Sequence, residues 1–234
     1  MKIRLAKALN KREHMDQSEA SGSVKVPSRR KQNKAQRKFE IIESAANCFM
    51  EQGYHATSID DVARRLGSTK GQIYHYYRSK TDLFFDVHRV GMGYLFEALE
   101  PASQAPGNGA DRLRAMLLAH ANAMLKYHTY ENVVAQGVQV HRFGKTTPDQ
   151  RQTIEELIHD RDRFEAHFKV QVEAGIKDGS LNASDPSIAV KVLLGGLQWS
   201  IFWYRPREGD TDDSRDKLAH AMVEPLLNGL MIRG

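Results

Sequence analysis

Residues 57–80 read TSIDDVARRLGSTKGQIYHYYRSK, and this stretch carries two short amphipathic segments on either side of a glycine. In the first segment Ile59 and Val62 fall at helical spacing, and the pattern ends at Gly67. The second segment spans 69–77 and is about two turns long. Two short helices joined by a tight turn that contains glycine are typical of a helix-turn-helix, whose second helix fits the major groove of DNA.

Three hydroxyl residues in this region are each followed, three positions later, by a side-chain acceptor. The pairs are Ser58 with Asp61, Thr69 with Gln72, and Ser79 with Asp82. This spacing lets a hydroxyl and an acceptor satisfy the free amides of a helix N-terminus. The three pairs therefore predict three closely spaced helix starts.

The second helix of this motif has an unusual outer face. If Ile73 and Tyr77, which are four residues apart, face the core, polar and aromatic side chains are left outside: Lys70, Gln72, Tyr74, His75 and Tyr76. These groups suit contacts with phosphates and base edges, and Gly71 lets the backbone approach a duplex closely. The alternative is an ordinary helical hairpin with tyrosines in its core. That arrangement is costly, because every buried hydroxyl would need a partner.

Upstream, apolar residues from Phe39 to Met50 predict a helix that stops at Gly53. Residues 1–38 contain twelve Lys or Arg and three acids, so they carry an excess of nine positive charges in a chain of net charge +5. We expect 1–33 to form a basic, mobile arm, with 29–31 as a candidate minor-groove contact on charge alone. A solvated tail that does not contact DNA is the alternative.

Downstream, helical periodicity continues and no segment alternates with the period of a strand. The expected helices cover 111–128, 131–143, 149–178, 186–204 and 213–231. The sequence thus predicts an all-α protein of about nine helices, with an arm over 1–33, a DNA-binding domain over 34–82 and a larger helical domain over 83–234. The mean hydropathy of −0.55 and the single Cys48 favour a cytoplasmic protein.

The residues of the motif resemble the DNA-binding domain of the TetR family of bacterial one-component regulators. The likeness covers about 36–90 and rests on 57–63, Gly67, 70–77, Ser79, Lys80, Leu83 and Phe84. Two residues depart from the family pattern: Ser68 stands where a small apolar residue is usual, and Ser58 where threonine is common.

The resemblance implies roles for individual residues. It places Ser58, Tyr74, Tyr76 and Lys80 at phosphate-contacting positions, and Lys70, Gln72 and His75 at positions that face bases or backbone. Thr69, at the start of the recognition helix, is counted with them. It also implies that the larger domain binds a ligand and forms a homodimer through its last two long helices. Such a dimer would bind a palindromic operator on double-stranded DNA as a repressor, and a ligand would release it through the fourth helix.

The larger domain offers candidate residues for a small hydrophobic effector, with a few polar groups among apolar and aromatic ones. They are Met116, His120, Met124, Tyr127, Val138, His141, Arg161, Phe164, Phe168, Trp199, Phe202 and Trp203. Such a lining suits a large, mainly apolar molecule. The alternative for any one of them is that it simply fills the core.

The segment 199–206 resembles a branch of the family that governs fatty-acid, aromatic or sterol-ring catabolism and senses CoA thioesters. A multidrug-responsive repressor of an efflux pump is the alternative. An enzyme is a further alternative, since Glu155, His159 and His167 share helical faces that suit a metal. However, the chain lacks the common phosphate-loop, nucleophile-elbow and zinc-protease motifs. We therefore expect no enzyme activity, no cofactor and no metal site.

Overall fold

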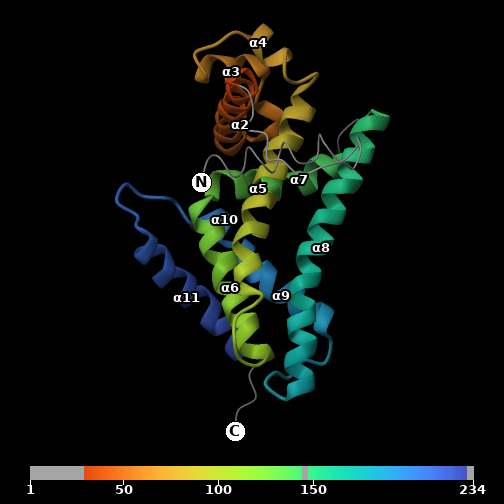
Figure 1. The fold of residues 1–234 in the computed structure, drawn as a ribbon, viewed down its shortest axis with the longest axis vertical. Coiled ribbons are helices and arrows are strands. Elements are labelled where there is room, and N and C mark those ends of the chain that lie inside the picture. Colours follow the sequence, from red (N-terminus) through yellow and green to blue (C-terminus); the bar gives the residue numbers. More distant parts are fainter. Residues whose placement is uncertain (1–28, 144–146, 231–234) are drawn as a thin grey trace. The chain divides into compact units, whose positions relative to one another are not determined.

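The computed structural model describes residues 29–143 and 147–230, with side chains described for 32–137 and 147–230. Over these residues the chain is helical and contains no strand, which confirms the predicted fold class (Figure 1). The helices are α2 (Arg29–Ala56), α3 (Ile59–Arg65), α4 (Lys70–Tyr74), α5 (Lys80–Ala102), α6 (Gly109–Lys126), α7 (His128–Phe143), α8 (Pro148–Asp178), α9 (Pro186–Gln198), α10 (Ser200–Trp203) and α11 (Asp212–Asn228). None of the helices in the described part is long and apolar enough to cross a membrane.

The chain divides into two compact units, Met1–Leu83 and Phe84–Gly234. In the first unit, α3 packs against both α2 and α4. The core of this unit consists of fully buried aliphatic and aromatic side chains, among them Ile42, Phe49, Val62 and Ile73. Burying such side chains stabilises the unit by about 1.5–3 kcal/mol each.

Helix α2 begins at Arg29, earlier than the sequence pattern predicted. The apolar stripe starts only at Phe39, and the preceding polar residues extend the helix without a buried face of their own. Gly53 takes a positive φ of 79°, as a stop signal requires, and one further short turn follows it. The Thr57 hydroxyl donates to the carbonyls of Gly53, at 2.8 Å, and Cys48, at 3.1 Å, which closes this end of α2.

Two of the three predicted caps form. Ser58 and Asp61 make a reciprocal capping box on α3, and the Asp82 amide donates to the Ser79 hydroxyl at 3.1 Å. Thr69 is the N-cap residue of α4, as the predicted helix start requires, but its side chain makes no capping hydrogen bond. The Gln72 side chain, which was expected to complete this cap, is instead held by two other side chains.

In the second unit, α6 packs against α8 and α11, and α9 also contacts both of these helices (Figure 1). The N-terminus of α6 is tied to the end of α8: the Gly109 amide donates to Asp178 at 2.7 Å and the Ala110 amide to Ser180 at 3.1 Å. The single helix expected over 186–204 is divided at Trp199, where the Phe202 amide bonds to the Trp199 carbonyl in a tighter turn.

Candidate functional site

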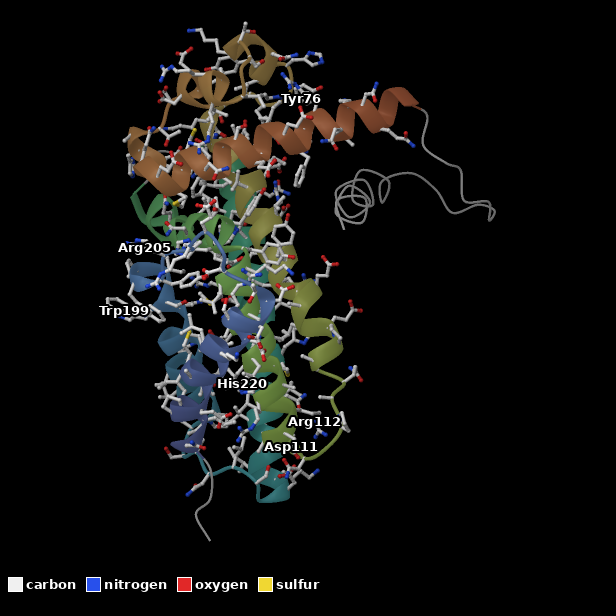
Figure 2. The ribbon with its side chains drawn as sticks, turned by 90° about the vertical axis from the view of Figure 1, so that its left-hand side faces the viewer. Tyr76, Asp111, Arg112, Trp199, Arg205 and His220 are labelled. Atoms are coloured by element: carbon white, nitrogen blue, oxygen red, sulfur yellow. The ribbon has the colours of Figure 1, made fainter. Side chains whose placement is uncertain are left out.

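Helix α4 has the two-sided character that the sequence predicted. Ile73 is fully buried and Tyr77 is 5% exposed, whereas the Tyr74 side chain is 51% exposed. His75 is exposed and its ring meets the half-buried ring of Tyr76 edge-on at 5.3 Å. Figure 2 labels Tyr76 next to α2. The helix itself is shorter than expected and ends at Tyr74, because the Tyr76 and Tyr77 amides both bond to the Ile73 carbonyl.

Two of the predicted base-facing residues are held by neighbours. The Gln72 amide oxygen accepts a hydrogen bond from Arg37 at 2.6 Å and another from the Ser68 hydroxyl. Both bonds use Oε1, so neither involves the NH₂ group of Gln72. Lys70 lies 3.6 Å from Asp60 in an exposed ion pair, which is weak in water and easily exchanged for a phosphate. These contacts orient both side chains on the outer face of α4.

The residues predicted to contact DNA phosphates differ in exposure and in the hydrogen bonds that they already make. Ser58 is exposed, and its hydroxyl donates to Asp61 at 2.6 Å while accepting from the Asp61 amide at 3.2 Å. The hydrogen bonds from Ser58 hold the pKa of the Asp61 carboxyl below its usual value. Thr69 is exposed at the start of α4.

Lys80 has a structural role that the sequence did not indicate. Its ammonium donates to the carbonyls of Tyr54 at 2.7 Å, Thr57 at 2.8 Å and His55 at 3.3 Å, and it lies 4.5 Å above the Tyr54 ring. Burial lowers the pKa of this lysine. Lys80 thus satisfies the free carbonyls at the end of α2, where a positive charge is favourable. Its contact with phosphate stays a prediction.

The second unit contains a cavity of about 290 Å³. Half a dozen of the predicted effector residues line it: His120, Met124, Arg161, Phe164, Trp199 and Phe202. The rest of the lining consists of Met92, Leu95, Glu131, Val134, Ala135, Gly195, Gln198 and Ile201. The structure therefore brings together side chains from α5, α6, α7, α8, α9 and α10.

Other predicted effector residues lie elsewhere. Met116 and Phe168 are fully buried in the hydrophobic core, Tyr127 stacks on Tyr94 at 3.9 Å, and Trp203 is 48% exposed. The side chains of Val138 and His141 lie outside the described part of the structure. The same holds for 29–31 of the predicted basic arm, and 1–28 are outside it altogether.

Two polar residues of the cavity are almost completely buried. His120 is 1% exposed and Glu131 is 2% exposed. Burial lowers the pKa of His120 to about 4 and raises the pKa of Glu131 to about 8. Sequence reasoning missed Glu131, although the signal was present: it precedes Val134 by three residues and Val138 by seven, so all three share a helical face.

An apolar surface follows the outer side of α9 and α10. Its large exposed side chains are Ile188, Val192, Trp199, Phe202 and Trp203, each between 48% and 62% exposed. Figure 2 shows Trp199 projecting outward from the ribbon. A methyl group added at Gly195 would meet no heavy atom within 4 Å. A methyl group at Gly196 would lie 2.8 Å from the Leu226 side chain on α11. Gly196 therefore permits close packing inside the subunit.

The described residues contain no cluster of three or more His, Cys, Asp or Glu side chains that would suit a metal ion. Glu155, His159 and His167, the candidates for a metal, are all exposed on α8.

Residues 41–87 match the bacterial regulatory proteins of the tetR family, and residues 106–230 match the tetracyclin repressor-like C-terminal domain. The HTH-type transcriptional repressor KstR2 of Rhodococcus jostii is 27% identical over 205 residues, which cover 84% of this chain and 92% of the relative. Two solved structures share the fold at lower identity.

The first is the ketosteroid transcriptional regulator KstR2 of Mycobacterium tuberculosis, with a TM-score of 0.71 and 19% identity over 92% of this chain and 100% of that one. The second is AibR in complex with isovaleryl coenzyme A and operator DNA, with a TM-score of 0.63 and 20% identity over 80% of this chain and 98% of that one. These relatives are transcriptional regulators and not enzymes. Since the match to the C-terminal domain alone spans more than half of the chain, the protein belongs to the TetR family of bacterial transcriptional regulators.

Proposed function

We propose that this protein is a ligand-responsive repressor that binds a palindromic operator as a homodimer. The observation that carries the proposal is the outer face of α4, where Tyr74, His75 and Lys70 are exposed while Ile73 anchors the helix from beneath. An exposed face of this chemistry on the second helix of a helix-turn-helix suits the major groove. The name of the R. jostii relative and the operator DNA in the AibR structure support this role.

The exposed apolar surface on α9 and α10 supports the homodimer. Soluble monomers rarely expose a contiguous row of large apolar side chains such as Val192, Trp199 and Phe202. A twofold axis along this surface would cover it with the same surface of a second subunit. Two recognition helices related by such an axis match the symmetry of a palindromic operator.

The effector that we propose is a CoA thioester with a hydrophobic acyl or ring portion. The cavity of about 290 Å³ is lined mainly by apolar side chains, which suit the acyl or ring portion. Arg161 is exposed yet lines the cavity, so it is available to a phosphate at the opening. The isovaleryl coenzyme A named for the AibR structure is a thioester of this class, and the ketosteroid named for the KstR2 structure is a hydrophobic ring compound.

Replacing Tyr76 with alanine is expected to weaken operator binding at least tenfold, because the ring and hydroxyl are lost from the DNA-facing turn. The duplex is first selected from random sequences, and binding is measured by fluorescence anisotropy. Tyr76→Phe serves as the matched variant, since it keeps the ring and removes only the hydroxyl. Sedimentation should show the same dimer for all three proteins. Unchanged affinity of Tyr76→Ala for DNA would refute the assigned contact.

Long-chain or aromatic CoA thioesters are expected to release the protein from the selected operator. A ligand does this only through a higher affinity for the state that does not bind DNA. The measurement is the fall in anisotropy on titration with each thioester, with the matching free acids and cationic drugs in parallel. Release by free acids or cationic drugs, with none by the thioesters, would contradict the proposed effector class.

A further inference from the structure

The buried end of the cavity contains polar atoms that have no partner within the protein. Both ring nitrogens of His120 and Oε1 of Glu131 are inaccessible to water and make no hydrogen bond within the described residues. The two residues come from different helices, α6 and α7, and line the same cavity. Leaving such a group unsatisfied costs free energy, which a ligand that supplies a hydrogen-bond partner would recover.

The surroundings of the two groups are otherwise apolar. His120 lies against the rings of Phe164 at 5.2 Å and Phe168 at 5.9 Å. Helix α5 approaches Glu131 closely, since a methyl group at Gly91 would lie 3.5 Å from Oε1. In such surroundings both side chains are uncharged at pH 7, given a pKa of about 4 for His120 and about 8 for Glu131. Each then offers one hydrogen-bond donor and at least one acceptor.

We propose that Glu131 and His120 bind a hydroxyl or carbonyl group carried by the otherwise apolar portion of the effector. This inference rests on the proposed function, because it takes the cavity to be the effector site. A neutral oxygen function can both accept from and, as a hydroxyl, donate to these two side chains without bringing a charge into the core. An ammonium group fits less well, because Arg161 also lines the cavity and repels it.

The titration of Glu131 is separable from that of the other titratable groups around the cavity. His120 of α6 and Arg161 of α8 line the same cavity, and Tyr130 precedes Glu131 on α7. Tyr127 lies between α6 and α7, and His88 lies on α5. The pKa of His88 is lowered to about 4 by burial, and that of Tyr127 is raised by burial. A change in ligand affinity between pH 7 and 9.5 that disappears in Glu131→Gln therefore belongs to Glu131.

The first experiment compares three probes that share one chain: 1-decanol, 1-chlorodecane and n-decylamine. Binding to the full-length protein is followed by tryptophan fluorescence, because Trp199 lines the cavity. We expect decanol to bind at least tenfold more tightly than chlorodecane. Glu131→Leu should abolish this preference, and Glu155→Leu, an exposed glutamate on α8 away from the cavity, should retain it.

The second experiment follows decanol binding against pH. Since the bound state requires the protonated carboxyl, affinity should be constant below the pKa of about 8 and about thirty-fold weaker at pH 9.5 than at pH 7. Glu131→Gln should show no such decline, whatever its affinity.

Equal binding of decanol and chlorodecane would overturn the inference, as would tightest binding of decylamine. Failure of every probe to bind would also overturn it. Operator binding is measured on the same samples by anisotropy, so these results are distinguishable from a failure of the proposed function. If the protein binds DNA and a CoA thioester releases it, the repressor proposal stands even where the probes show no preference.

Discussion

Gly109→Ala is expected to destabilise the second unit by at least about 4 kcal/mol, lowering its midpoint of thermal unfolding by roughly 10 °C. A methyl group at Gly109 would lie 2.2 Å from the Gly175 nitrogen and 2.4 Å from its Cα. Both are backbone atoms of α8, so no side chain can rotate away to make room. Relief would require α6 to move off α8, breaking the hydrogen bonds from Gly109 to Asp178 and from Ala110 to Ser180.

The matched control for this experiment is Gly93→Ala. Gly93 is also helical, and a methyl group there would meet no heavy atom within 4 Å. Alanine is the better helix former, so this variant should be stabilised by up to about 1 kcal/mol. Urea unfolding of both variants, followed by circular dichroism, gives the comparison. Equal stability of the two would show that the close approach of α6 to α8 is not a constraint.

The stability of the protein is expected to be highest near pH 6.5 and to decline on both sides. Glu131 has a pKa of about 8 in the folded state against 4.5 for the free group, so the folded state binds more protons than the unfolded state between these values. Its contribution therefore falls as pH rises, by roughly 3 kcal/mol between pH 5 and pH 8.

The buried histidines act in the opposite direction. The pKa values of His88 and His120 are about 4 against 6.5 for the free group, so the unfolded state binds more protons between these values and stability falls as pH is lowered below 6.5. Urea unfolding at half-unit steps from pH 5 to 8.5 measures both limbs. Glu131→Gln should remove the decline above pH 6.5 and leave the acid limb in place. A decline of the same size in this variant would contradict the assignment to Glu131.

The helix-turn-helix was predictable from the sequence because its signals are local. Ser58 and Asp61 form the cap that their spacing indicates, and Ile73 and Tyr77 are buried as their four-residue separation requires. Thr69 has the same spacing to Gln72, but its side chain makes no capping hydrogen bond, and the Gln72 side chain is held by Arg37 and Ser68 instead. Arg37 is 35 residues away, and no local pattern reports such a competitor.

The cavity was less predictable, for a related reason. The sequence identified aromatic and polar residues that suit an apolar ligand. However, residues that fill the core and residues that line a cavity show the same helical periodicity, so the pattern cannot tell them apart. Phe164 and Phe168 differ by one turn of α8; Phe164 lines the cavity and Phe168 is fully buried in the core. Which of the two phenylalanines reaches the cavity depends on how α6 packs against α8, and a helical pattern does not report that packing. Glu131 was overlooked because an acidic residue near a helix start is usually a surface residue.

The burial of Cys48 has a practical consequence. This thiol is the single cysteine of the chain, it is 2% exposed, and burial raises its pKa, so it reacts slowly with alkylating reagents and oxidants. Spin labels or fluorophores can therefore be attached to cysteines introduced on the surface while the native residue stays in place. Distances between labels on the subunits of the proposed homodimer would then test whether an effector changes the separation of the two recognition elements in solution.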